Sequence, residues 1–152
     1  ADAPFLYWTG AVWGAAIPLS KEDAELTADQ GLVEAMETRA LELDESFGQG
    51  AIHDFFIAYD GGRPPSAGGS VERARAHFAR AVAISSGKRA APYVSLAETV
   101  SVGTQDRAEF EALLKKALAV DPDAAPQLRL ANTVAQRRAS WLLARADQLF
   151  LE

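Results

Sequence analysis

ALAVDPDAAPQLRLANT, residues 117–133, decides the fold of this chain, because two other segments align with it. They are ALELDESFGQGAIHDFF, residues 40–56, and AVAISSGKRAAPYVSLA, residues 81–97. Each segment starts at an alanine, passes through a turn rich in Gly, Pro, Asp or Ser, and continues into a new apolar run. This pattern predicts the end of one helix, a short turn and the start of the next helix. The chain therefore reads as a series of helical hairpins.

The three segments start 41 and 36 residues apart, close to the 34-residue period of tetratricopeptide repeats with loop insertions. Small residues at the joints let neighbouring helices approach closely, and each hairpin buries its apolar face against the next one. We expect one tetratricopeptide-like helical repeat domain over residues 1–152, an all-α α-solenoid of about seven helices.

The composition agrees with a helical protein and excludes several classes. The 152 residues include 31 Ala but only 9 Val and 4 Ile, which favours helices over strands. A hydrophobic content of 49% and a charged content of 24% exclude a disordered chain. The net charge of −6 argues against nucleic-acid binding, which needs clustered cations. The absence of Cys excludes disulfides, thiolate metal sites and a Cys nucleophile.

Capping residues and helix-breaking glycines and prolines predict where the helices begin and end. Ser70 is a predicted N-cap, and Asp106 with Glu109 resembles a capping box. GGRPPSAGG, residues 61–69, is a predicted surface loop. The last predicted helix is long and continuous. The predicted helices cover residues 4–17, 30–44, 49–60, 71–85, 92–102, 106–121 and 126–149.

The sequence offers little for catalysis. His53 and His77 lie in separate helical segments, and neither belongs to a zinc-protease or nucleophile-elbow motif. The Gly-rich loop 61–69 follows no strand and precedes no Gly-Lys-Ser/Thr, which excludes a phosphate loop. Asp121 and Asp123 lack the spacing of a calcium loop. We expect no enzyme activity, no cofactor and no metal site.

The first predicted helix is apolar around most of its circumference. Residues 3–20 carry no charge, near the length of a membrane span, but glycines and a late proline favour a buried helix instead. Its aromatic side chains Tyr7, Trp8 and Trp13 either pack against a further hairpin or face a ligand channel. We expect this helix to leave apolar surface exposed in this chain, to be hidden by oligomerisation.

First helices of hairpins in such arrays usually line the concave face, where ligands and partners bind. A few polar groups among apolar neighbours could orient a small ligand there, or could bond to helix ends. The candidates are His53, Phe56, Tyr93, Glu98, Asn132 and Gln136. Three arginines of the last predicted helix are either solvated or paired across a protein interface: Arg137, Arg138 and Arg145.

Four stretches together resemble the T-component (TatT) family of tripartite ATP-independent periplasmic (TRAP) transporters. They are FLYWTGAVWGAAIPLSK from residue 5, RALELDESFGQGAIHDFFIAYDGGRP from residue 39, RARAHFARAVAISSGKRAAPYVSLAETVSV from residue 73, and QDRAEFEALLKKALAVDPDAAPQLRLANTVAQRRASWLLARADQLFL from residue 105. The resemblance covers nearly all of the chain, in order. It corresponds to the C-terminal part of the family's usual length.

The resemblance implies a tetratricopeptide-like periplasmic protein, lipid-anchored in full-length relatives. Such a protein associates with the substrate-binding P-component of the transporter, and a hydrophobic channel in it is a suggested site for an apolar small molecule. We therefore expect a non-catalytic transport accessory subunit that is a homo-oligomer. The alternative is a generic tetratricopeptide scaffold that clamps an extended peptide on its concave face.

Overall fold

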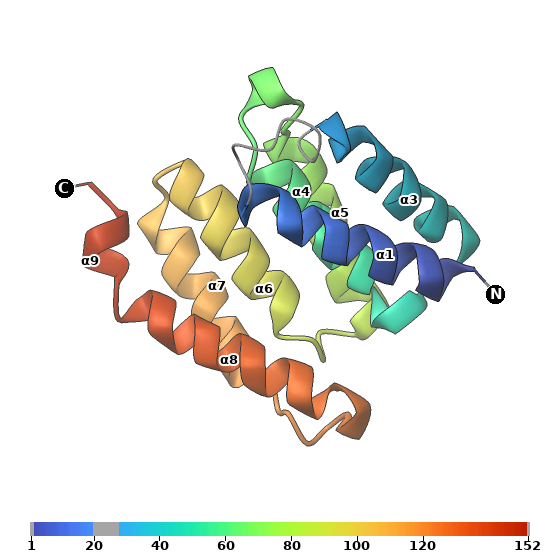
Figure 1. Cartoon of the computed structure of the whole chain (residues 1–152). Coiled ribbons are helices and arrows are strands. Elements are labelled where there is room, and N and C mark those ends of the chain that lie inside the picture. The colour runs from blue at the N-terminus through green and yellow to red at the C-terminus, as the bar shows by residue number, and fades with distance from the viewer. Residues whose placement is uncertain (1, 20–27, 152) are drawn as a thin grey trace. The chain divides into compact units, whose positions relative to one another are not determined.

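The computed structural model describes residues 2–19 and 28–151, and over these residues the chain forms helices and turns but no strand (Figure 1). The expected all-α fold with helical hairpins is confirmed. Eight α-helices lie in the described part, against about seven expected. They are α1 (Ala3–Ala16), α3 (Gln30–Leu43), α4 (Ala51–Gly61), α5 (Val71–Ser85), α6 (Ala91–Leu96), α7 (Arg107–Ala119), α8 (Arg129–Leu143) and α9 (Ala146–Leu149).

The chain divides into two compact units, residues 1–52 and residues 53–152. In the first unit, α1 and α3 pack side by side as an antiparallel hairpin (Figure 1). Val33 and Ala40 of α3 are fully buried. Gly10 permits a close approach of the two helices, because a Cβ at that position would lie 2.6 Å from Oε1 of Glu37.

Helix α1 keeps an exposed apolar face. Phe5 is 71% exposed, Trp8 61% and Val12 67%, which confirms the exposed apolar surface expected from the sequence. The expectation that α1 is a buried helix is wrong, since only Ala3 and Gly10 of this helix are buried. The hairpin with α3 covers a single side of α1. Among the described residues, no helix combines the length and apolar character that a membrane crossing needs.

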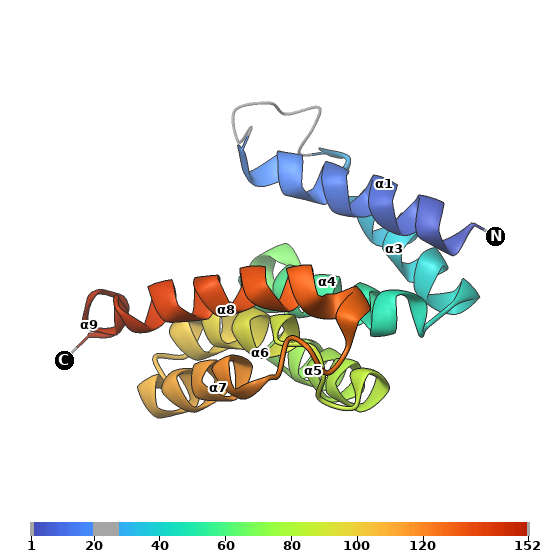
Figure 2. The same cartoon turned by 90° about the horizontal axis from the view of Figure 1, so that it is seen from below.

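In the second unit, helices α6, α7 and α8 pack against one another, and Figure 2 shows them side by side. Their core side chains are long aliphatic or aromatic residues at helical spacing, with small alanines between them. Ile57 of α4 joins this core. The largest fully buried members are Phe110, Ile57, Leu96, Leu114, Leu142 and Val100. Helix α6 continues directly into a π-helical segment, Ala97–Ser101, whose wider turn was not expected from the sequence.

The aligned segments behave as the sequence predicts. Each contains the end of one helix, a turn and the start of the next: α3 to α4, α5 to α6, and α7 to α8. The alanines that open the three segments, Ala40, Ala81 and Ala117, are all fully buried. A larger side chain at these positions would push the helices apart. Close helix packing therefore explains why all three segments start with alanine.

Two helix starts follow the predicted caps. The Ser70 hydroxyl accepts a hydrogen bond from the backbone N–H of Arg73 at 3.2 Å, and the Asp106 carboxylate accepts one from that of Glu109 at 2.9 Å. The prediction of one continuous last helix over residues 126–149 is wrong. Helix α8 ends at Leu143, because Arg145 leaves the helical conformation. The chain then turns so that the rings of Phe110 and Phe150 meet edge to face, with centroids 5.0 Å apart.

Candidate functional site

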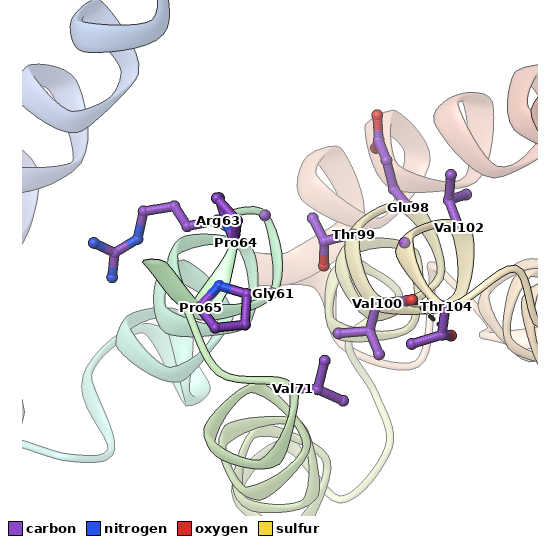
Figure 3. Close-up of a pocket in the computed structure, with 12 residues that line it drawn as sticks. Gly61, Arg63, Pro64, Pro65, Val71, Glu98, Thr99, Val100, Val102 and Thr104 are labelled. Atoms are coloured by element: carbon purple, nitrogen blue, oxygen red, sulfur yellow. Dashed lines mark hydrogen bonds between the residues drawn. The ribbon is translucent and has the colours of Figure 1, made fainter. Parts of the chain in front are cut away.

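A groove of about 550 Å³ lies between the loop that follows α4 and the π-helical segment that follows α6. This volume is in the range of small-molecule sites. Figure 3 shows Pro65, Val71 and Val100 around its centre, whereas the charged ends of Arg63 and Glu98 point away from it. The lining residues are Gly61, Gly62, Arg63, Pro64, Pro65, Val71, Glu98, Thr99, Val100, Val102, Gly103 and Thr104.

The threonines of the groove add little polarity to it. The Thr99 hydroxyl donates to the carbonyl of Ser95 at 2.7 Å, and the Thr104 hydroxyl donates to that of Val100 at 2.9 Å. Each hydroxyl is therefore tied to the backbone of its own helix. The groove is consequently suited to an apolar group.

Arg63 holds the shape of the loop. Its Nε donates to the Tyr59 carbonyl at 2.8 Å, and its Nη1 donates to the Ala67 carbonyl at 3.0 Å. The guanidinium also lies 3.6 Å from the centre of the Tyr59 ring, which adds a cation–π contact. A second arginine also holds the loop expected from GGRPPSAGG, since Nη2 of Arg73 on α5 donates to the Gly68 carbonyl at 2.5 Å.

The other wall of the groove is fixed by Glu98, a residue singled out in the sequence. Its carboxylate pairs with the guanidinium of Arg138 on α8, which donates from both Nε and Nη2. Gly61 lets α4 end close to the π-helical segment, since a Cβ there would lie 2.7 Å from Oγ1 of Thr99. The ion pair makes Glu98 a support of the wall rather than a free charge in the groove.

His53 and Phe56 do not border the groove, and both contact His77. Nδ1 of His53 lies 2.7 Å from Nδ1 of His77, and the ring of Phe56 stacks on His77 with centroids 4.8 Å apart. Burial, followed by the nearby His53, lowers the pKa of His77 below its usual value of 6.5. Within residues 2–19 and 28–151, no three side chains of metal-ligating type gather into a cluster.

Three other candidates are engaged in packing or in hydrogen bonds to helix ends. The Tyr93 ring contacts Phe78 edge to face, with centroids 5.5 Å apart. Asn132 is buried; its Oδ1 accepts from the Ala90 N–H at 2.9 Å, and its Nδ2 donates to the Lys88 carbonyl at 2.8 Å. Gln136 donates to the carbonyls at the end of α7, with the shortest contact, 2.7 Å, to that of Val120.

The aromatic candidates of α1 lie in the first unit. The Tyr7 ring contacts those of Trp8 and Phe47 edge to face, with centroids 5.0 and 5.3 Å apart. Trp8 is largely exposed, whereas Nε1 of Trp13 is buried and has no hydrogen-bond partner among the described residues. Their role as channel residues stays a prediction.

Several structural features escaped the sequence analysis. The groove itself is formed by residues 61–65, Val71 and residues 98–104, which have no motif in common. Asp54 on α4 pairs with Arg89 at 3.2 Å and accepts a hydrogen bond from the Ser95 hydroxyl at 2.9 Å. Burial raises the pKa of Asp54, while Arg89 and Ser95 counteract that effect. The sequence signals for the groove were Glu98 as a candidate residue and the turn chemistry of the loop next to a predicted helix end.

Similarity to known proteins extends over nearly the whole chain. An uncharacterized protein of Treponema pallidum (strain Nichols) is 29% identical over 151 residues, which is 99% of this chain and 47% of the relative. The chain thus spans about half the length of the curated relative that it matches. Residues 1–150 match the family described as TRAP transporter T-component. The resemblance seen in the sequence is confirmed, and the chain belongs to the TRAP transporter T-component family.

Proposed function

We propose that this chain acts as a non-catalytic accessory subunit of a TRAP-type transporter on the periplasmic side of the membrane. In this role it docks the substrate-binding P-component and holds an apolar small molecule. The observation that carries the proposal is the family match over residues 1–150. In full-length relatives we expect a lipid anchor, and we expect this protein to work as a homo-oligomer in a tetratricopeptide-like α-solenoid.

The groove supports the part of the proposal that concerns a ligand. Its volume of about 550 Å³ suits a small molecule, and its centre is bordered by Pro65, Val71 and Val100. The hydroxyls of Thr99 and Thr104 already donate to backbone carbonyls. A polar ligand would therefore lose hydrogen bonds to water that these hydroxyls do not replace. We therefore assign the ligand to the class of apolar or mainly apolar molecules.

The same structure argues against the alternative of a peptide clamp. Such a clamp needs side-chain amides that are free to bond to an extended backbone. Asn132 uses its amide on the backbone of Lys88 and Ala90, and Gln136 uses its amide on the end of α7. Both candidates are therefore occupied within the fold.

Co-purification tests the docking role. The tagged full-length protein should recover the substrate-binding P-component of its own transporter from a periplasmic extract, identified by mass spectrometry. Recovery of no substrate-binding protein contradicts the accessory role. A scaffold for extended peptides would instead recover partners with no relation to transport.

Native mass spectrometry with a groove variant tests the ligand role. A Cβ at Gly103 meets no atom within 4 Å, so Gly103→Leu should extend into the groove without disturbing the helices. Gly31→Leu, in α3, is the matched control, since a Cβ there also meets no atom within 4 Å. We expect an apolar molecule to co-purify with the wild type and the control, and to be lost from Gly103→Leu. Equal retention of the molecule by all three proteins would exclude the groove as its binding site.

A further inference from the structure

Helix α8 presents an outward face that combines large apolar and cationic side chains. Leu130 is 78% exposed, Val134 58% and Trp141 43%, and all three point to the same side of the helix at spacings of four and seven residues. The buried face of α8 is opposite and contains Asn132, Ala135, Ala139 and Leu142. The apolar side chains span about 17 Å along the helix axis, at about 1.5 Å per residue.

Trp141 is held in place by two arginines on this face. The guanidinium carbon of Arg138 lies 4.3 Å from the centre of the Trp141 ring, and that of Arg145 lies 4.1 Å from it. Arg138 is itself held by the carboxylate of Glu98. An aromatic ring that is ordered before binding loses less conformational entropy when a partner covers it. Trp and Arg are also the side chains that most often dominate binding energy at protein interfaces.

The charge of this face has the opposite sign to that of the whole chain. Residues 129–145 contain four arginines and no acidic residue, in a protein with a net charge of −6. Arg129 pairs with Asp123 at 3.0 Å, and Arg138 pairs with Glu98. Arg137 is exposed and makes no ion pair with any residue that the structure describes. We define the α8 face by Leu130, Val134, Arg137, Arg138, Trp141 and Arg145. Its chemistry is complementary to a partner surface that combines carboxylates with apolar groups.

We propose that the α8 face is the surface on which this chain docks an acidic, apolar surface of the substrate-binding P-component. The inference rests on the proposed function and adds to it the docking residues and the chemistry of the partner. Charge complementarity accelerates association and fixes orientation, while Trp141, Leu130 and Val134 supply the apolar burial that holds the complex together. An anionic lipid surface is the less suitable occupant, because the chain as a whole is negatively charged.

The test measures affinity between the full-length protein and the purified P-component of the same transporter by biolayer interferometry. Arg137→Glu and Trp141→Ala, each alone, should weaken binding at least tenfold, and wild-type affinity should fall as salt rises from 50 to 500 mM. Two controls should bind within twofold of wild type. They are Lys116→Glu, an exposed cation of α7, and Leu32→Ser, an apolar residue of α3 that is 49% exposed.

The outcomes distinguish an error in the docking face from an error in the proposed function. If the wild type binds and the α8 variants bind within twofold of it, the docking face lies elsewhere and the proposed function stands. If the wild type shows no binding at micromolar concentrations, both proposals fall. Because Arg137 is exposed and unpaired in the described part of the chain, Arg137→Glu should fold normally. A wild-type circular dichroism spectrum and melting temperature verify this, and Arg137→Gln provides a second variant with a smaller expected loss.

Discussion

Nδ1 of His53 on α4 and Nδ1 of His77 on α5 lie 2.7 Å apart and share one hydrogen bond between the two helices. One ring must donate and the other must accept, so the pair fits at most one added proton in this geometry. His77 is surrounded by Phe56, which stacks on it, by Asp60, which favours its charged form, and by Arg73, which disfavours it.

The histidine pair predicts acid sensitivity of the α4–α5 hairpin. Burial lowers the pKa of His77 in the folded state, so the unfolded chain takes up a proton first as the pH falls below about 6.5. The free energy of unfolding should therefore fall between pH 7 and pH 5. His77→Phe should reduce this pH dependence and cost about 1 kcal/mol at pH 7 through the lost hydrogen bond.

Urea unfolding of both proteins at several pH values measures this difference. Nuclear magnetic resonance titration of the imidazoles gives an independent readout, in which the His77 pKa lies below 6.5. A His77 ring that titrates above that value contradicts the packing described here.

A buried carboxyl in the α1–α3 hairpin predicts the opposite pH dependence. Glu37 is fully buried, neither of its oxygens has a hydrogen-bond partner among the described residues, and burial raises its pKa to about 8. The folded state keeps its proton at a pH where the unfolded chain loses it, so stability falls as pH rises from 4.5 towards 8. The slope is about 1.4 kcal/mol per pH unit within this interval. Glu37→Gln should remove it.

The readout can be confined to this hairpin. Trp8 and Trp13 both belong to α1, so in a Trp141→Phe background the tryptophan fluorescence reports on residues 1–52. Denaturant unfolding at pH 6 and pH 9 then compares the protein that keeps Glu37 with the Glu37→Gln variant in the same background. Parallel pH dependence in the two proteins would show that the Glu37 carboxyl is solvated.

The same substitution at two glycines should have opposite effects. Gly10→Ala places a Cβ 2.6 Å from Oε1 of Glu37, and because this side chain is fully buried and has little room to shift, the crowding should cost about 1–3 kcal/mol. Gly31→Ala in α3 meets no atom within 4 Å and should stabilise the helix by up to about 1 kcal/mol. Thermal unfolding of the two variants measures the sign of each change in stability. Stabilisation by Gly10→Ala would contradict the close approach of α1 and α3.

Asn132 should behave as a structural residue. Its side chain bonds to the backbone of both Lys88 and Ala90, in the turn before α6. Asn132→Ala leaves these buried groups without partners and should cost about 2–3 kcal/mol in the free energy of unfolding. Binding of the apolar ligand, measured below the melting temperature, should be unchanged. A variant of normal stability that fails to bind ligand would restore Asn132 to the list of binding residues.

Much of the fold could be predicted from the sequence. The helix joints follow from local chemistry: Ser70 and Asp106 cap their helices, and the buried alanines Ala40, Ala81 and Ala117 mark the repeat. The break after Leu143 could not be predicted, because α9 is positioned by the long-range contact between Phe110 and Phe150. Local propensity contains no information on such a contact.

The candidate site was less predictable. Of the residues singled out, Glu98 borders the groove, while His53 and Phe56 gather around His77. Whether a helical side chain faces a groove, a neighbour or solvent depends on how each helix is rotated about its axis. Tertiary packing sets that rotation, and here the π-helical turn at residues 97–101 shifts it further.

Hydrogen–deuterium exchange of the full-length protein, with and without its purified P-component, tests the central claim most directly. We expect a complex in which peptides covering residues 129–145 exchange more slowly, while peptides from residues 30–43 are unchanged. Identical exchange throughout the chain, at P-component concentrations up to 100 μM (about −5.5 kcal/mol of binding free energy), would contradict the claim that this chain is a docking subunit.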